Sequence, residues 1–131
     1  MPVTPQDTPN APPVAGPYSP AVRAGDWLVF SGQVGFDPAT GALAAGGAGA
    51  QCRQAMTNLA AVLTDCGASW SDVAKTTIFV TDLTQFGAIN EAYAEFLGEH
   101  RPARATVQVV ALPIGAEVEI EAWAYLGSQG S

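Results

Sequence analysis

Two runs of alternating apolar and polar residues near the C-terminus place the strongest constraint on the fold. The first run, 104–111, has alanine or valine at every odd position. The second run, 116–125, has alanine, valine or isoleucine at every even position. Since successive side chains of a strand point to opposite faces, each run predicts a strand with one apolar face. The intervening segment, Leu112–Gly115, has the composition of a hairpin connection.

The polar faces of the two runs predict a functional surface. If both apolar faces pack against one core, the polar side chains of both strands lie together on the other face of the sheet. The pairing register does not change this, because a slip of one residue would turn the apolar side chains of a whole strand away from the core. A planar guanidinium among carboxylates is suited to gripping an acidic ligand and to proton transfer. The residues expected to share this face are Arg104, Thr106, Gln108, Glu117, Glu119 and Glu121. The pattern alone does not single out one of the three glutamates.

The same alternation is also typical of a solvated antiparallel sheet without any function, and the pattern leaves both interpretations open. Trp123 and Tyr125 fall on the charged face of the second run. Large aromatic side chains fit a pocket or an interface better than bulk water. They therefore favour the functional interpretation.

Composition restricts the class of protein. The length of 131 residues predicts a single domain spanning 1–131. Hydrophobic residues make up 48% and charged residues 13%, which indicates that some surface is shared with other copies of the chain. No run approaches the ~20 apolar residues of a membrane span. The N-terminus lacks a basic segment followed by an apolar core, so no secretion signal is expected.

The charge balance disfavours nucleic acid as a partner. The formal net charge is −7, and the five basic residues form no cluster. Binding to a phosphate backbone requires several cationic contacts. We therefore expect small molecules, rather than RNA or DNA, to be the ligands.

Cysteine and histidine usage argues against disulfides and metals. Cys52 and Cys66 fall in one helical pattern, where fourteen residues separate their Cα atoms by roughly 21 Å, and a bridge requires less than about 7 Å. They are expected to be free thiols in a reducing, cytoplasmic environment. The only histidine, His100, is expected at the surface near a helix end. We expect neither a metal site nor a cofactor.

The remaining patterns predict an α+β domain. Proline-rich residues 1–15 indicate an extended, poorly ordered arm, and 16–22 an edge strand or its lead-in. Strands are predicted over 27–31 and 73–80, and helices over 50–66 and from Thr84, as N-cap, to about 98–100. With both helices on one sheet face, the other face, bearing Arg104 and the glutamates, is expected to be covered by self-association.

Several short segments, in the same order over about residues 11–126, resemble the Rid family of reactive-intermediate deaminases, formerly called YjgF proteins. No single motif suffices, and the resemblance rests on their combination. The segments are Ala11–Ser19, Val29–Gln33, Asp37–Gly41, Gln51–Leu59, Asp72–Thr77, Asn90–Tyr93, Pro102–Arg104 and Glu119–Glu121.

This resemblance implies a chorismate-mutase-like fold, with a mixed sheet of about six strands and two helices on one face. It also implies a homotrimer with clefts between subunits. Archetypal members are 2-iminobutanoate/2-iminopropanoate deaminases, which hydrolyse 2-imino or 2-enamine acids to 2-keto acids and ammonia. Arg104 matches the residue that binds the substrate carboxylate, and Glu119 the one that positions water. Tyr18, Ser31 and Asn90 match further cleft positions, and Thr106 stands where many members have cysteine.

Three other functions stay open from the sequence. The chain could be a non-catalytic trimer that binds small carboxylates or proteins through Arg104. It could be a ribonuclease or translation inhibitor, activities attributed to some members of the family, although the acidic charge argues against this. It could also be a deaminase devoted to one pathway intermediate rather than to many imines.

Overall fold

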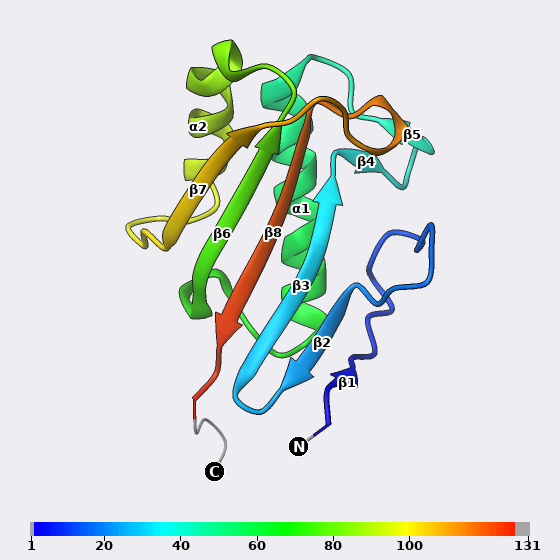
Figure 1. The fold of residues 1–131 in the computed structure, drawn as a ribbon, viewed down its shortest axis with the longest axis vertical. Coiled ribbons are helices and arrows are strands. Elements are labelled where there is room, and N and C mark those ends of the chain that lie inside the picture. Colours follow the sequence, from blue (N-terminus) through cyan, green and yellow to red (C-terminus); the bar gives the residue numbers. More distant parts are fainter. Residues whose placement is uncertain (1, 128–131) are drawn as a thin grey trace.

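The computed structural model describes residues 2–127 and shows a mixed six-stranded sheet in the order β1-β2-β3-β8-β6-β7 (Figure 1). Two longer helices are present, α1 (Ala48–Asp65) and α2 (Phe86–Ala94). A separate two-stranded ladder lies between β3 and α1 in the chain. The strands are β1 (Thr4–Pro5), β2 (Ala21–Ala24), β3 (Trp27–Val34), β4 (Phe36–Asp37), β5 (Ala42–Leu43), β6 (Val73–Val80), β7 (Ala103–Gln108) and β8 (Val118–Tyr125).

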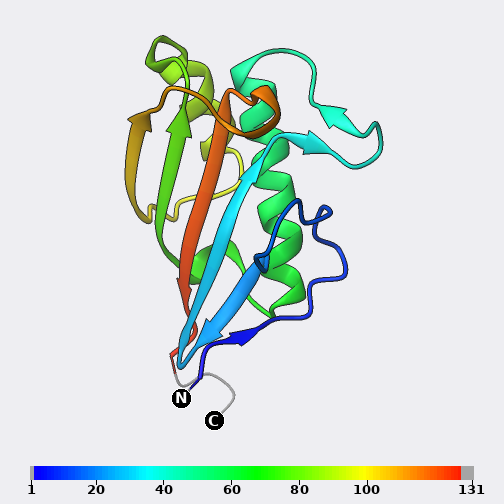
Figure 2. The same cartoon turned by 45° about the vertical axis from the view of Figure 1, so that its right-hand side comes forward.

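Both helices lie on one face of the sheet, which confirms the predicted α+β architecture (Figures 1 and 2). β8 runs antiparallel to β3 and to β6, so β3 and β6 are parallel and α1 is the crossover between them. α2 connects β6 to its parallel neighbour β7. Both crossovers move in the same direction across the sheet, and crossovers of the usual right hand then place their helices on the same face.

The core lies between α1 and the centre of the sheet. The apolar positions of β8 are fully buried beneath the helices, as the alternation predicts, whereas Glu119, Glu121, Trp123 and Tyr125 point to the opposite side. The face that the helices leave uncovered is called the open face below. The buried residues that α1 contributes are Cys52, Ala55, Met56, Leu59, Val62 and Leu63.

The predicted hairpin between the two alternating runs is wrong. β7 pairs only with β6, at the edge of the sheet, whereas β8 lies on the other side of β6. The connection crosses the end of β6 and contains a 3-10 turn, Pro113–Gly115. Proline and glycine mark the reversal of the chain correctly, but a reversal does not require that the two strands become neighbours.

The prediction that Arg104 and the glutamates share one face is also wrong. Thr76 of β6 is the register partner of both Arg104 and Ala122, and paired residues of neighbouring strands point to the same side. Arg104 and Thr106 therefore face the helices, whereas Glu119 and Glu121 face away. At the edge of the sheet the apolar positions of β7 lie on the open face instead, where Val107 is half-exposed.

Other details differ from the sequence prediction at the ends of elements. The N-terminal arm is not free of structure, because β1 pairs with β2 and the Asn10 side chain bonds to Asp65 at the end of α1. α2 is shorter than predicted and is preceded by a 3-10 turn capped by Asp82, whose carboxylate accepts from the Thr84 N–H. Thr84 is therefore not the cap. Met1 and residues 128–131 lie outside the described residues.

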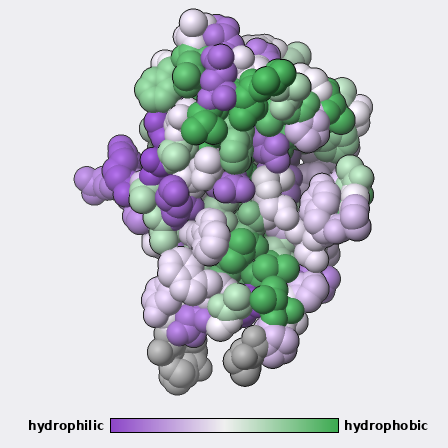
Figure 3. Space-filling model, viewed as in Figure 1, coloured by the Kyte–Doolittle hydropathy of each residue, from purple (hydrophilic) through white to green (hydrophobic). Residues whose placement is uncertain are grey.

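The open face carries mixed apolar and polar side chains (Figure 3). Trp27, Trp123 and Tyr125 form an aromatic cluster on it, with ring centroids 6.2 Å apart for the tryptophan pair and 5.0 Å for Trp27 and Tyr125. All three remain substantially exposed. Trp123 and Tyr125 therefore lie on the charged face of β8, as the sequence predicts. None of the helices in residues 2–127 is long and apolar enough to cross a membrane.

Candidate functional site

Arg104 lies against aromatic rings of α2. Its guanidinium carbon is 5.1 Å from the centre of the Tyr93 ring and 5.4 Å from that of Phe86. Phe86 and Tyr93 are seven residues apart on α2, so they share one helical face, and β7 packs beneath it. Contacts of a cation with ring faces at this range are attractive and restrict the orientation of the guanidinium plane.

A buried hydrogen bond fixes one of these rings. The hydroxyls of Tyr93 and Thr76 lie 2.7 Å apart, and Thr76 is completely buried. Thr76 is the strand neighbour of Arg104, so the bond ties the ring to the same part of the sheet. Sequence reasoning missed Phe86, Tyr93 and Thr76 as site residues. The helical spacing places Phe86 and Tyr93 on one face, but nothing in it reveals Arg104 as their neighbour.

Two buried polar atoms accompany Arg104. Asn90 lies between Phe86 and Tyr93 on the same face of α2, and Thr106 is two residues from Arg104 on the same face of β7. Asn90 Oδ1 and Thr106 Oγ1 are buried, and neither has a hydrogen-bond partner among residues 2–127. Buried polar atoms are normally paired, so both are available to a ligand. We call Phe86, Asn90, Tyr93, Arg104 and Thr106 the arginine half-site.

Within the described chain, no carboxylate neutralises Arg104. The ion pair between Arg53 and Glu95 is the only one found in residues 2–127, and no hydrogen bond to the Arg104 side chain is found there either. The guanidinium is partly buried and held by aromatic faces alone. Its fork of N–H donors is therefore free to bind an external carboxylate.

Glu119 lies apart from the arginine half-site, beside a cavity of about 290 Å³ on the other side of the sheet. Tyr18 and Ile114 also line this cavity, and residues 12–15 of the arm complete its wall. Only Tyr18, Gln33 and Glu119 contribute polar side chains to the lining. We call Tyr18, Gly32, Ile114 and Glu119 the carboxylate half-site.

Gly32 makes room for the Glu119 side chain. A Cβ atom at position 32 would lie 2.8 Å from the Glu119 carboxyl carbon, and closer still to Oε2. The pairing of β3 with β8 is interrupted between Phe30 and Gln33, which is a bulge of the kind often found beside functional sites. Burial raises the pKa of Glu119 above its ordinary value, and the nearby charge of Glu121 raises it further. A raised pKa suits a group that accepts and returns protons near neutral pH.

The structure separates the three glutamates that the sequence could not distinguish. The side chain of Gln51 on α1 holds Glu117: its Oε1 accepts from the Glu117 N–H at 2.8 Å, and its Nε2 donates to Glu117 Oε2 at 3.1 Å. Glu117 is therefore occupied by a structural contact. Glu121 shares the face of Glu119 but does not line the cavity. Only Glu119 is both partly buried and exposed to the cavity.

Ser31 supports the segment that carries Tyr18. Its hydroxyl donates to the Ser19 carbonyl at 2.6 Å, and its N–H donates to the Pro20 carbonyl. Ser31 itself does not line the cavity, whereas Tyr18 does, with its side chain half-exposed. Within one chain, Ser31 thus positions Tyr18, and its hydroxyl keeps the capacity to accept one further hydrogen bond.

One chain cannot bring its two half-sites together. β6 lies between β7, which carries Arg104, and β8, which carries Glu119. At ~4.8 Å per strand the two strands are roughly 10 Å apart. The side chains also leave the sheet on opposite faces, so the sheet itself stands between them.

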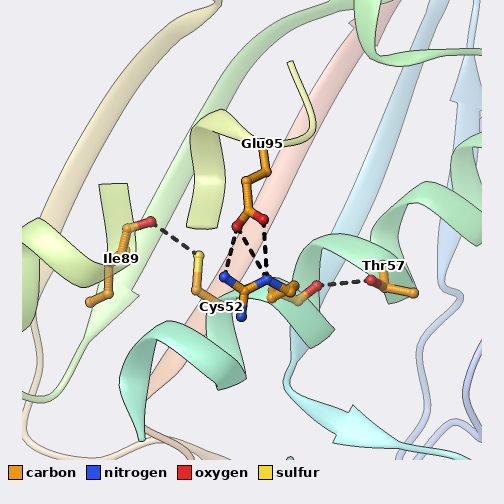
Figure 4. Close-up of polar contacts among 5 residues, drawn as sticks. Cys52, Thr57, Ile89 and Glu95 are labelled. Carbon is orange, nitrogen blue, oxygen red and sulfur yellow. Dashed lines mark hydrogen bonds and ion pairs between the residues drawn. The ribbon is translucent and has the colours of Figure 1, made fainter. Parts of the chain in front are cut away.

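α1 fixes the position of α2 through contacts near the arginine half-site (Figure 4). The Cys52 thiol donates to the Ile89 carbonyl, and Arg53 forms an ion pair with Glu95 at 2.7 Å. Burial raises the pKa of Cys52 to about 12, so this thiol is protonated at neutral pH and is not a nucleophile. Both cysteines are free. His100 is half-buried rather than at the surface, with Nε2 2.8 Å from the Val73 carbonyl.

No group of three histidine, cysteine, aspartate or glutamate side chains within residues 2–127 is arranged to hold a metal ion. Asn58 donates to the carbonyls of Val34 and Phe36 and so fastens the end of β3 to α1.

Comparison with known proteins identifies relatives over nearly the whole chain. The Endoribonuclease L-PSP family profile matches residues 8–126. The chain is 44% identical to the 2-iminobutanoate/2-iminopropanoate deaminase of Mus musculus over 92% of this chain and 89% of that protein. It is 45% identical to a RutC family protein of Pyrococcus horikoshii over 90% of this chain and 94% of that protein. The crystal structure of RidA from the Antarctic bacterium Psychrobacter sp. superposes with a TM-score of 0.86 at 44% identity. The superposition covers 92% of this chain and 97% of that structure.

Proposed function

The chain belongs to the Endoribonuclease L-PSP family, the Rid family that its motifs resemble, and on this premise we propose that it hydrolyses 2-imino acids to 2-keto acids and ammonia. The observation that carries the proposal is the unpaired guanidinium of Arg104, held between aromatic rings beside two buried, unpartnered polar atoms. A small molecule that carries a carboxylate for the guanidinium and a nitrogen that can hydrogen-bond to the two polar atoms matches this set of groups.

In the proposed complex the substrate carboxylate accepts two parallel hydrogen bonds from Arg104. Asn90 Oδ1 accepts a hydrogen bond from the imine N–H, and the Thr106 hydroxyl bonds to water or to the imine nitrogen. These contacts hold the electrophilic carbon in place, so that the attack of water becomes effectively unimolecular. A protonated imine is already electrophilic, and the reaction requires neither a covalent nucleophile nor a cofactor.

Glu119 is the proposed general base. Its carboxylate accepts a proton from the attacking water as the new C–O bond forms, which gives a tetrahedral carbinolamine. The same proton then goes to the amine nitrogen. As the C–N bond breaks, its electron pair leaves with ammonia and the carbinolamine oxygen becomes the keto oxygen, while Glu119 takes the hydroxyl proton and passes it to ammonia, which leaves as ammonium. Overall, one iminium acid and one water give one keto acid and one ammonium ion. Acid–base assistance of this kind is typically worth ~10²–10⁴-fold in rate.

Since one chain holds its half-sites apart, we propose that each working site joins the arginine half-site of one copy to the carboxylate half-site of another. A contact between two different surfaces of the same chain is heterologous, and it closes into a ring when the rotation permits. The family resemblance supports a trimer as the ring that we propose. It would also cover the open face, where Val107 and the cluster of Trp27, Trp123 and Tyr125 are exposed.

Mixed oligomers test this arrangement directly. Arg104→Ala and Glu119→Gln are each expected to keep at most about 1% of the wild-type rate alone. When the two variants are unfolded together and refolded as an equal mixture, about one site in four should combine an intact Arg104 with an intact Glu119 from different chains. Keto-acid release from 2-iminobutanoate, generated in place by a dehydratase, should then return to about a quarter of the wild-type rate.

The control is the same refolding of each variant alone, which should stay at about 1% of the wild-type rate or below. A mixture with no recovered activity, from chains that refold and co-assemble, would contradict a site shared between copies. Wild-type protein that binds 2-ketobutanoate saturably without accelerating keto-acid release would instead identify a non-catalytic binding module. Degradation of RNA by a pure preparation, abolished in Arg104→Ala, would support the ribonuclease alternative.

A further inference from the structure

Apolar side chains from separate parts of the chain meet at the cavity beside Glu119. Val14 and Tyr18 come from the arm and its continuation, and Ile114 comes from the connection between β7 and β8. They are 42%, 51% and 64% exposed, among the most exposed large apolar residues of the described chain. Exposed apolar groups that gather around one concave surface indicate a binding site rather than chance exposure.

Ile114 also has an unfavourable backbone conformation. Its φ is 55° and its ψ is 21°, and it is the only non-glycine residue with positive φ in residues 2–127. A β-branched residue in this region is a genuine outlier, since glycine or asparagine adopts it at lower cost. Hydrogen bonds from Gly115 to Leu112 and from Ala116 to Pro113 hold the turn. Strain of this kind, retained at an exposed position, points to a role outside folding.

The charge of the cavity restricts what it can accept. Glu119 is the only charged side chain in its lining, and Gln33 and Tyr18 are its only other polar ones. An acidic group beside Glu119 would be repelled, whereas a basic one would pair with the carboxylate that the proposed reaction needs. An uncharged aliphatic group would bury apolar surface without either effect.

We propose that this cavity receives the substrate side chain and selects 2-imino acids with branched or extended aliphatic side chains, with Ile114 as the specificity-determining contact. This inference rests on the proposed function. The cavity of about 290 Å³ lies at the lower limit of the ~300–1,000 Å³ typical of small-molecule sites. A substrate with only a methyl side chain would leave most of it unfilled.

The test compares two imines released in place by an amino-acid oxidase, 2-imino-4-methylpentanoate from leucine and 2-iminopropanoate from alanine. Wild-type protein is expected to have the higher kcat/KM for the larger imine. Ile114→Asn keeps a residue that tolerates positive φ but replaces the apolar contact by an amide. It should lower kcat/KM for the larger imine ~10-fold and change that for the smaller imine by less than about twofold.

Val110→Asn is the matched control, because Val110 lies in the same connection, is fully exposed and does not line the cavity. It should leave both rates unchanged. Ile114→Gly provides a second variant, which relieves the backbone and removes the side chain, and it should repeat the selective loss with an unchanged or higher Tm.

The outcomes separate the two proposals. If wild-type protein accelerates the hydrolysis of neither imine, the deaminase function itself is wrong. If it hydrolyses both, but the Ile114 variants lose activity equally on both or on neither, the deaminase function stands and the side-chain subsite is wrong. A change of oligomeric state in both Ile114 variants, measured by light scattering, would show that Ile114 serves the contact between copies instead.

Discussion

The arginine half-site and the carboxylate half-site are built in different ways. Arg104 projects from a strand onto the face of a helix, and a buried hydrogen bond between Tyr93 and Thr76 fixes its surroundings. Glu119 also belongs to a strand, but its surroundings are a bulge, a turn and the N-terminal arm. Under the proposed function, the first would be a rigid half that recognises the constant part of a substrate, and the second an adjustable half that meets its variable part.

The largest expected effect comes from breaking the rigid half. Arg104→Ala removes two charge-assisted hydrogen bonds to the substrate carboxylate, each worth ~1.5–3 kcal/mol. We expect kcat/KM to fall by ~10³-fold, measured with 2-iminobutanoate. Arg104→Lys keeps the charge without the planar fork and should recover only part of this loss. Full activity in Arg104→Lys would mean that charge alone, and not bidentate geometry, holds the acid.

The next largest loss of activity is expected from substituting Glu119 in the carboxylate half-site. Glu119→Gln keeps the size of the side chain but removes the base, and kcat should fall ~10²-fold or more, with a smaller change in KM. In the wild type, burial raises the pKa of Glu119, so kcat should decline on acidification through a pKa above the ordinary 4.5. An acidic limb that stays in place in Glu119→Gln, measured on its residual activity, would assign the titration to another group.

The same substitution should stabilise the fold at neutral pH. The pKa of Glu119 is higher in the folded chain than its ordinary value of 4.5, so the folded state favours the protonated form. The stability gained from protonation is complete below the ordinary value and is lost as the pH rises through the raised one. Glu119→Gln should therefore have a higher Tm than wild type at pH 7 and little advantage at pH 4. A lower Tm at pH 7 would show that the ionised carboxylate is stabilised by contacts that burial alone does not reveal.

A smaller effect is expected from the support beneath Arg104. Tyr93→Phe keeps the ring but leaves the buried Thr76 hydroxyl without a partner, which should lower the free energy of unfolding by ~1–3 kcal/mol. Thr76→Val together with Tyr93→Phe replaces both partners by apolar groups and should restore most of this loss. Urea denaturation of the two variants measures the difference. Equal destabilisation of the single and double variants would mean that the loss does not come from the unpartnered Thr76 hydroxyl.

The smallest effect should come from the arm. Both donors of Asn10, the backbone N–H and the side-chain amide, bond to the Asp65 carboxylate at 2.8 and 2.7 Å, and so hold the segment that walls the cavity. Asn10→Ala should raise KM about two- to threefold with little change in Tm, since exposed contacts of this kind are worth ~1 kcal/mol or less. Ser71→Ala, which removes an exposed hydrogen bond to the Ser69 hydroxyl away from the cavity, is the control and should leave KM unchanged.

The periodicity of apolar residues was sufficient to predict the buried face of those elements that pack against the core on one side only. The apolar positions of β8 and of α1 are the buried ones, and β6 has the predicted bounds, Val73–Val80. In each case burial of one face fixes which residues point inward. The free cysteines follow from the same helical pattern.

β7 shows where this reasoning fails. Its alternation separates Arg104 and Thr106 correctly from Ala105 and Val107, but the pattern does not say which set faces the helices. At the edge of the sheet the helix-facing positions carry the polar residues, and the apolar ones lie on the open face. That assignment depends on α2 and on the order of strands, which are long-range properties. The cavity likewise depends on the arm, whose docking through Asn10 has no signature in the local sequence.

The opposite orientation of Arg104 and Glu119 has a consequence for when the protein can act. No rotation of a side chain passes through a hydrogen-bonded sheet, so under the proposed function a single chain is inactive because of its geometry. Under the proposed function, turnover per molecule should vanish on dilution below the association threshold and return on concentration. A newly synthesised chain would then begin to hydrolyse reactive imines only after it had assembled with other copies of the chain.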